Sequence, residues 1–261
     1  MSSVVRKHDR GPFDIIGDVH GCFDELVMLL EQLGYSVEGR GERTSVKPPA
    51  GRKTVFVGDL VDRGPKIPAV LRLVMGMVAA GTALCLPGNH DDKLTRALMG
   101  RKVKIQHGLE QSLEQLADES PEFKSQVRQF FESLPSHYLL DDGKLVVVHA
   151  GLKANLHGQT GKAVRSFALF GDTTGKLDEH GLPERRDWAA AYRGKPLIVY
   201  GHTPVAEAHW VNNTVNIDTG CVFGGSLTAL RYPELETVAV KALRTYAESR
   251  RPFLPLDVSE A

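Results

Sequence analysis

Residues 13–26 read FDIIGDVHGCFDEL, and this stretch decides which fold is expected. Phe13–Ile16 is a short apolar run typical of a buried strand, and apolar residues then recur at helical spacing until Gly34 ends the helix. The turn between them carries Asp18 and His20. The stretch therefore predicts a strand–turn–helix unit with metal-ligating side-chain types at the carboxyl end of the strand.

The same kind of unit recurs along the chain. Residues 54–57 and 83–86 are further short β-type runs, and a helical pattern covers residues 65–81 between them. Strands that alternate with helices predict an α/β fold. Because ligands in α/β sheets bind at the carboxyl ends of the strands, the turns that follow these runs are candidate functional segments.

Three longer segments interrupt this alternation. Residues 35–51 are rich in Gly, Arg, Glu and Pro and predict a surface excursion. Residues 106–134 predict two amphipathic helices that form a helical insertion over the sheet. Residues 158–193 are polar and poorly periodic, which indicates a long loop with a short helix. We expect the insertion and the loop to roof the active site and to decide substrate size.

The second half of the chain returns to β structure. Asp142-Gly143 predicts a hairpin turn, residues 196–200 predict a buried strand, and residues 208–240 predict a β meander. We expect residues 1–261 to form a single domain, with a C-terminal tail over about 244–261.

Composition narrows the class of protein. The 261 residues are 42% hydrophobic and 25% charged, with 32 basic and 32 acidic side chains, so nothing indicates a nucleic-acid-wrapping surface or a membrane patch. No secretory signal and no run of roughly 20 apolar residues occurs, which predicts a cytoplasmic protein. Cys22, Cys85 and Cys221 lack metal-site spacing and are interpreted as reduced packing residues.

Five strand-end turns carry the chemistry. They are GDVHG (17–21), GDLVDRG (58–64), GNHD (88–91), VHAG (148–151) and GHTP (201–204). Their candidate metal ligands are Asp18, His20, Asp59, Asn89, His149 and His202. Six oxygen and imidazole ligands without a thiolate fit two divalent metals better than one structural zinc. Two ions roughly 3.5 to 4 Å apart can bind phosphoryl oxygens and produce hydroxide from a bridging water at neutral pH.

Each turn also has a purely structural interpretation. A single Gly-Asp turn is structural more often than not, and His149 or His202 alone could be a satisfied core histidine or a strand terminator. Because five such turns all occur at strand ends, a functional role is favoured over a purely structural one. The remaining histidines do not share the pattern and are interpreted as surface or packing residues: His8, His107, His137, His157, His180 and His209.

The ordered motifs resemble the calcineurin-like metallophosphoesterase superfamily, in particular its phosphoprotein-phosphatase-type branch, whose second motif has the VDRG ending seen at 61–64. The resemblance implies a four-layer α/β/β/α sandwich with a dinuclear metal site. Manganese is the first choice of metal, with iron, zinc or nickel as alternatives. The resemblance assigns Asp18, His20 and a bridging Asp59 to one metal, and Asp59, Asn89, His149 and His202 to the other.

Three residues between the ligands suit catalysis. His90 is placed to protonate the leaving oxygen as a general acid, and Asp62 would orient its imidazole. The planar donors of Arg63 would bind phosphate oxygens. A surface salt bridge is the structural interpretation of Arg63.

Several stretches are also similar to the phosphatase module of bacterial polynucleotide kinase-phosphatase and to bacterial PrpE-type phosphatases, some described as bis(5'-nucleosyl)-tetraphosphatases. This likeness adds Asp218, in the DTG motif, as a residue behind the ligands. Asp91 stands where eukaryotic protein phosphatases carry Glu, which argues against protein phosphatase activity. No P-loop motif is present.

These observations predict a dinuclear metal-dependent phosphoesterase that uses a metal-bridging hydroxide. Its expected substrate is a nucleotide, a dinucleoside polyphosphate or a nucleic-acid terminal phosphate. The alternatives are a serine/threonine protein phosphatase and a non-catalytic metal-binding scaffold. No membrane association and no obligate protein partner is indicated.

Overall fold

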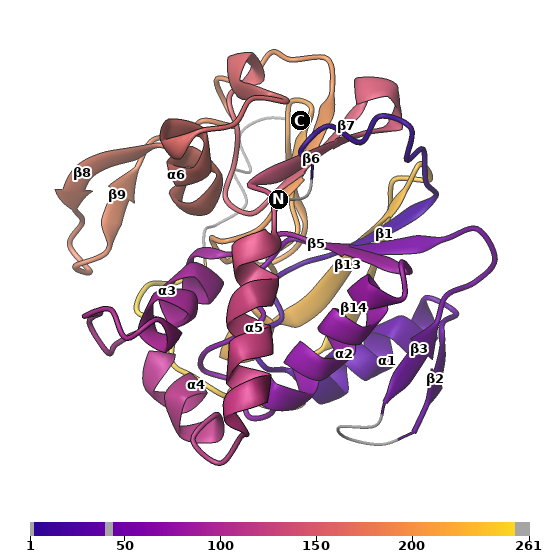
Figure 1. The fold of residues 1–261 in the computed structure, drawn as a ribbon. Coiled ribbons are helices and arrows are strands. Elements are labelled where there is room, and N and C mark those ends of the chain that lie inside the picture. Colours follow the sequence, from indigo (N-terminus) through magenta and orange to yellow (C-terminus); the bar gives the residue numbers. More distant parts are fainter. Residues whose placement is uncertain (1–2, 40–43, 254–261) are drawn as a thin grey trace.

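Two five-stranded sheets packed face to face form the centre of the protein, with helices on both outer faces (Figure 1). The computed structural model describes residues 3–39 and 44–253. The layers follow the order helix, sheet, sheet, helix, which confirms the predicted four-layer α/β/β/α sandwich.

Both sheets mix parallel and antiparallel pairs. The first has the strand order β14-β13-β1-β4-β5, with bounds Glu236–Lys241, Ser226–Tyr232, Phe13–Ile16, Lys53–Phe56 and Ala83–Cys85. The second has the order β11-β12-β10-β7-β6, with bounds His209–Val211, Thr214–Asn216, Leu197–Tyr200, Leu145–Val148 and His137–Leu140. In each sheet three neighbouring strands are parallel: β1, β4 and β5 in the first, and β12, β10 and β7 in the second.

The alternation of side chains along the central strands creates the layers. Phe13 and Ile15 of β1 pack between the sheets, whereas Ile16 packs against the helices outside the first sheet. In β7, Val147 faces the space between the sheets and Val148 faces the outer side. Because successive strand residues point to opposite faces, β1 and β7 each join two cores and are buried along their whole length.

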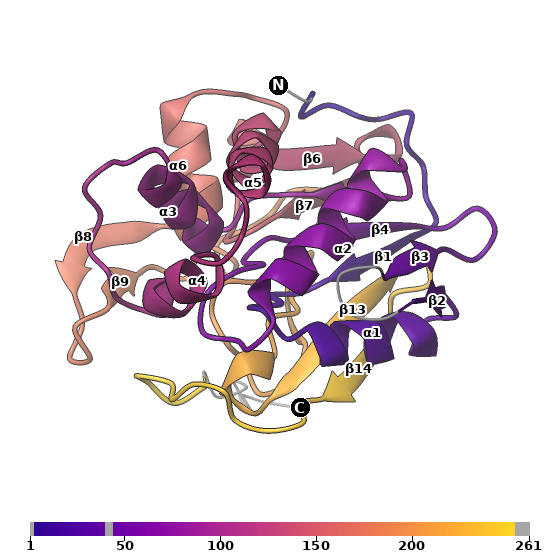
Figure 2. The same ribbon diagram turned by 60° about the horizontal axis from the view of Figure 1, so that its bottom comes forward.

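Helices cover the first sheet more heavily than the second. The bounds of the helices are α1 Phe23–Gln32, α2 Ile67–Ala79, α3 Asn89–Leu98, α4 Leu109–Gln115, α5 Pro121–Ser133 and α6 Lys162–Phe170. Helices α1 to α5 contribute to the core outside the first sheet, and α6 packs on the second. The predicted helical insertion is confirmed as α4 and α5, which lie beside α3 (Figure 2).

Two segments contain more structure than the sequence indicated. The excursion at 35–51 contains a hairpin of β2 (Ser36–Glu38) and β3 (Ser45–Lys47), and the loop at 158–193 adds a hairpin of β8 (Thr173–Leu177) and β9 (Pro183–Arg185) to its helix. These ribbons are mostly exposed, so no buried apolar alternation marks them.

The prediction of one continuous C-terminal β meander is wrong. β11 and β12 pair with each other and join the second sheet, whereas β13 and β14 pair with each other and join the first. The short 3₁₀ helix η4 (Cys221–Phe223) lies between these pairs. The residues of a turn indicate a hairpin, but they do not determine which sheet the hairpin joins.

The predicted hairpin at Asp142-Gly143 is confirmed, with a longer turn than expected. Residues Asp141, Asp142 and Gly143 all have positive φ and form the 3₁₀ helix η2 (Asp141–Gly143) between β6 and β7. A further 3₁₀ helix, η3, covers Ala154–Leu156. Among residues 3–39 and 44–253, every helix is too short or too polar to cross a lipid bilayer.

His137 gives this fold a testable pH dependence. It is fully buried in β6, its Nε2 accepts a hydrogen bond from the Gly158 N–H at 2.9 Å, and burial lowers its pKa to about 4. An unfolded histidine titrates near pH 6.5, so between these values the unfolded chain binds the extra proton and stability falls as pH falls.

We expect this histidine to make the protein about 2 kcal/mol less stable at pH 5 than at pH 7. The His137→Gln variant retains an acceptor but cannot titrate, so its urea unfolding free energy should lose that part of the pH dependence. An unchanged difference between the two pH values in the variant would contradict the assignment.

Candidate metal centre and active site

The predicted ligand residues meet at the edge where strands of the two sheets end. The turns after β1, β4 and β5 supply His20, Asp59 and Asn89, and the turns after β7 and β10 supply His149 and His202. Two groups of donor atoms form there, each with its atoms within 4.8 Å of one another: His20, Asp59 and His90, and Asp59, His149 and His202. Asp59 belongs to both groups, as expected of a bridging carboxylate.

The second group is the tighter one. His149 Nε2 lies 3.0 Å from His202 Nδ1, 3.1 Å from Asn89 Oδ1 and 3.5 Å from Asp59 Oδ2. The Nδ1 atom of His149 faces the Val57 carbonyl oxygen at 3.2 Å. A carbonyl oxygen only accepts hydrogen bonds, so His149 Nδ1 carries the proton. The lone pair of its Nε2 therefore points at the other candidate metal-ligating atoms. This is the tautomer that a metal site requires.

His20 is oriented in the same way. Its Nδ1 donates to the Val61 carbonyl oxygen at 2.7 Å, which leaves the Nε2 lone pair 3.6 Å from Asp59 Oδ2. Burial lowers the pKa of His20 well below its usual value, and burial likewise lowers that of His149 to about 3. Both imidazoles are therefore neutral, the form that binds metal ions.

The carboxyl groups at this edge are crowded and buried. Burial, reinforced by the charge of Asp91, raises the pKa of Asp59 well above its usual value. Burial and the charges of Asp218 and Asp59 do the same for Asp18. Divalent cations would reverse this repulsion, because they favour the ionised carboxylates. The donor types, the fixed tautomers and the crowded acids together fit a divalent metal cofactor.

Asp18 takes a different position from the other predicted ligands. Its carboxylate accepts the His202 N–H at 3.2 and 3.1 Å, so it ties the turn after β1 to the turn after β10. It belongs to neither donor group found among the described residues. Asp218 lines the adjoining cavity and accepts the Gly220 N–H at 3.1 Å.

His90 is engaged at both ring nitrogens. Its Nδ1 lies 2.5 Å from Asp62 Oδ2, and its Nε2 accepts from the Arg63 guanidinium at 2.9 Å. Asp62 is held in turn by Ser112, which donates to Asp62 Oδ1 and accepts the Asp62 N–H at 2.9 Å. The structure thus forms a chain from helix α4 through Asp62 to His90, and Ser112 is a member that the sequence patterns did not reveal.

Two arginines face the histidines that are predicted to bind metal. Arg63 donates to His20 Nε2 at 2.7 Å as well as to His90, and Arg185, at the end of β9, donates to His202 Nε2 at 2.8 Å. Burial lowers the pKa of Arg185 to about 10, so it remains a cation at neutral pH. Arg185 was not predicted, because it lies in the poorly patterned segment 158–193.

Backbone strain is concentrated here. Ten described non-glycine residues have positive φ, and six of them belong to this region: His20, Asp59, Asp62, Arg63, His107 and His202. Each such residue costs roughly 1 to 2 kcal/mol relative to ordinary backbone. Such strain persists only where surrounding packing holds it, and it is typical of functional sites.

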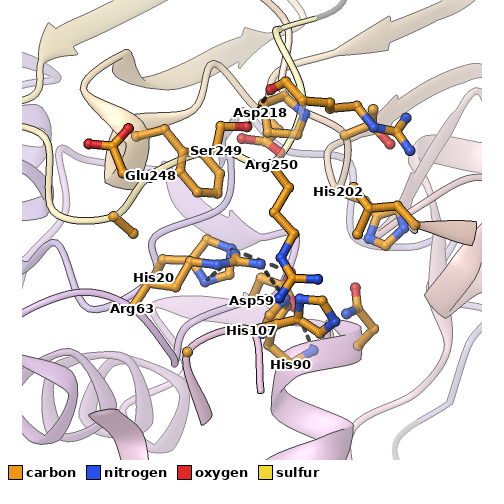
Figure 3. A pocket seen from close by; sticks show the side chains of 18 of the residues that line it. His20, Asp59, Arg63, His90, His107, His202, Asp218, Glu248, Ser249 and Arg250 are labelled. Carbon is orange, nitrogen blue, oxygen red and sulfur yellow. Dashed lines mark hydrogen bonds and ion pairs between the residues drawn. The ribbon is translucent and has the colours of Figure 1, made fainter. Parts of the chain in front are cut away.

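A cavity of about 490 Å³ opens onto these residues (Figure 3). The insertion contributes His107, Gly108, Glu110 and Gln111, and the segment after α6 contributes Leu182, Pro183 and Arg185, which confirms that both segments form walls of the site. Residues 246–251 of the expected C-terminal tail also line the cavity. His107, interpreted from the sequence as a surface or packing residue, is half-buried in this wall.

Comparison with known proteins identifies the class. A family model of calcineurin-like phosphoesterases matches residues 11–238. The chain therefore belongs to the calcineurin-like phosphoesterase family and is a metallophosphoesterase, as its motifs predict. Family membership implies divalent metal ions, in agreement with the two donor groups.

Individual relatives show which metallophosphoesterases this chain is similar to. Bis(5'-nucleosyl)-tetraphosphatase PrpE [asymmetrical] from Anoxybacillus flavithermus is 50% identical over 246 residues, covering 92% of this chain and 99% of the relative. The protein of the same name from Bacillus subtilis is 48% identical over 248 residues, covering 94% and 99%. The predicted similarity to PrpE-type phosphatases is thereby confirmed.

Solved structures support the fold. A crystal structure with the provisional description of diadenosine tetraphosphatase superposes with a TM-score of 0.66 at 24% identity, covering 92% of this chain and 97% of that one. A protein serine/threonine phosphatase from Saccharomyces cerevisiae superposes with a TM-score of 0.61 at 15% identity, covering 92% and 83%. The sandwich is thus common to phosphatases of different substrates.

The close approach of the backbone at Gly88 can be tested. A Cβ atom at this position would lie 1.9 Å from Asp59 Oδ1, which also accepts the His90 N–H at 3.0 Å. We expect Gly88→Ala to displace the Asp59 carboxylate and to reduce bound metal, measured by elemental analysis, together with about 100-fold or more of the phosphatase activity.

Gly76→Ala is the matched control, because a Cβ there meets nothing within 4 Å and the position is inside helix α2. It should leave metal content unchanged and stabilise the protein slightly. Full metal content in Gly88→Ala would show that Asp59 is not held in this way.

Proposed function

We propose that this protein hydrolyses dinucleoside polyphosphates, such as diadenosine tetraphosphate, as a metal-dependent phosphoesterase. The observation that carries the proposal is the convergence of candidate metal-ligating atoms of Asp59, Asn89, His149 and His202 beside a cavity that arginine side chains line. The substrate class is supported by the name of relatives that match almost their full length.

Two divalent ions would be bound, with manganese as the proposed metal. The residues proposed to hold them are Asp18, His20 and Asp59 on one side, and Asp59, Asn89, His149 and His202 on the other. When bound, such ions supply polarisation of the phosphoryl group and activation of the attacking water. A cation at His20 requires Arg63 to release Nε2, and the released guanidinium donors then become available to a phosphate.

His90 is the proposed general acid for the leaving oxygen. Burial and the nearby Arg63 charge lower its pKa well below the usual value. A bound phosphate that pairs with Arg63 offsets this charge and adds a negative one, so it favours the protonated imidazole beside Asp62. Arg185, at the opposite histidine His202, would hold further phosphate oxygens.

Two wider properties are also proposed. We infer a cytoplasmic location, since the three cysteines are free and buried, as suits a reducing compartment. We also infer that residues 1–261 act as one domain, supported by the core that both sheets share.

A substrate panel tests the proposed function. We expect turnover of diadenosine tetraphosphate to exceed that of a phosphoserine peptide and of a 3'-phosphorylated oligonucleotide, to disappear with a chelator and to return with Mn²⁺. Asp59→Asn should lower kcat/KM by at least about 100-fold while the protein stays folded. A preference for the peptide would assign the enzyme to the protein phosphatases, and a preference for the oligonucleotide would indicate action on nucleic-acid ends.

Ser112→Ala tests the chain behind His90. Without the hydroxyl, the Asp62 carboxylate loses a hydrogen bond and the imidazole is held less firmly. We expect kcat to fall about tenfold with little change in KM, because the lost interaction acts on the transition state. Ser125→Ala on α5 is the control and should have normal kcat. Equal kcat in both variants would remove Ser112 from the mechanism.

A further inference from the structure

The chain after β14 crosses from one side of the active site to the other. We refer to residues 243–251 as the strap. Its first part is anchored on Glu25, a fully buried residue of α1, whose Oε1 accepts the Leu243 N–H at 3.0 Å and the Tyr246 hydroxyl at 2.7 Å. The N–H groups of Tyr246 and Ala247 donate to the Val222 carbonyl oxygen at 3.0 and 3.1 Å.

The strap also packs closely on the loop around η4. A Cβ atom at Gly224 would lie 2.5 Å from Thr245 Oγ1, so only glycine allows the two segments to approach this far. At its other end, Arg251 pairs with Asp178 in the turn of the β8–β9 hairpin, where both side chains are largely buried. The C-terminal segment, yellow in Figure 2, runs from β14 toward this hairpin.

Both ends of the strap are therefore fixed, and its middle forms a wall of the cavity. Glu248, Ser249 and Arg250 line the cavity between the two anchors. The Arg250 side chain extends into the cavity toward His107 (Figure 3), and its charge is a cause of the lowered pKa of His107. Among the described residues, no acidic side chain forms an ion pair with Arg250.

Four arginines of the described residues line the cavity, and one of them, Arg251, is paired with Asp178. Arg63 and Arg185 donate to the histidines of the two donor groups, whereas Arg250 comes from the strap and is not engaged with them. A phosphomonoester brings a single phosphate, which the metal-ligating edge and Arg63 can hold. A polyphosphate chain is longer and carries further charges that need partners away from that edge.

We propose that Arg250 determines specificity by binding a substrate phosphate other than the one that reacts. Its planar donors match phosphate oxygens, and no acidic side chain of residues 3–39 and 44–253 forms an ion pair that would occupy them. The strap positions this arginine, because the strap is anchored on Glu25 before Arg250 and on Asp178 directly after it. The inference rests on the proposed function, since it names the group that favours polyphosphates over monoesters.

The test compares two substrates in one enzyme preparation saturated with Mn²⁺. We expect Arg250→Ala to lower kcat/KM for diadenosine tetraphosphate by about 10- to 100-fold, mainly through KM, and to leave turnover of p-nitrophenyl phosphate unchanged. Arg250→Lys should recover part of the loss, because lysine keeps the charge but not the planar fork.

Arg244→Ala is the matched control. Arg244 belongs to the strap but stacks on the Tyr246 ring at 5.1 Å and does not line the cavity. It should affect both substrates equally or not at all. An equal loss on both substrates in Arg250→Ala, or no loss on either, would overturn the role proposed for Arg250.

A second measurement separates this inference from the proposed function. If the unaltered enzyme fails to hydrolyse diadenosine tetraphosphate, the proposed substrate is wrong. Inhibition of p-nitrophenyl phosphate turnover by inorganic tripolyphosphate then tests Arg250 alone. We expect the inhibition constant for tripolyphosphate to rise about 10-fold or more in Arg250→Ala, with that for orthophosphate unchanged. An equal rise in the inhibition constants of tripolyphosphate and orthophosphate would contradict the role proposed for Arg250.

Discussion

The Asp59 carboxylate is the point on which the rest of the site depends. Its Oδ1 accepts the His90 N–H at 3.0 Å, and its Oδ2 lies 3.6 Å from His20 Nε2 and 3.5 Å from His149 Nε2. Asp59 and His20 follow strands of the first sheet, whereas His149 follows a strand of the second. One side chain therefore joins both sheets, and any change in how the sheets pack changes the distances around it.

The core between the sheets supplies the rigidity that this arrangement needs. Strands β1 and β7 are buried along their whole length, and well-packed interiors resist small displacements. That rigidity holds the left-handed backbone at His20, Asp59 and His202, which would relax in a softer setting. It also holds buried acids in one place, at a cost in the metal-free protein that divalent ions would offset.

The edge that carries the candidate metal ligands and the walls of the cavity come from different parts of the chain. The edge is made by short turns of the two sheets, whereas the walls come from the insertion, the β8–β9 hairpin and the strap. Superposition with a serine/threonine phosphatase at 15% identity shows that the sandwich itself does not specify a substrate. We therefore propose that the walls, to which Arg185 and Arg250 contribute, determine substrate preference.

The sequence by itself indicated the alternation of strands and helices, the insertion and the strand-end turns, because each depends on local periodicity or on a turn next to a strand. The four-layer sandwich was expected from the resemblance of the ordered motifs to a known family. Tertiary structure alone brought Ser112 to Asp62, Arg185 to His202 and the strap to the cavity. It also decided which sheet receives each C-terminal hairpin. These partners are far apart in sequence and lie in exposed or weakly periodic segments, so only the packing of the whole chain selects them.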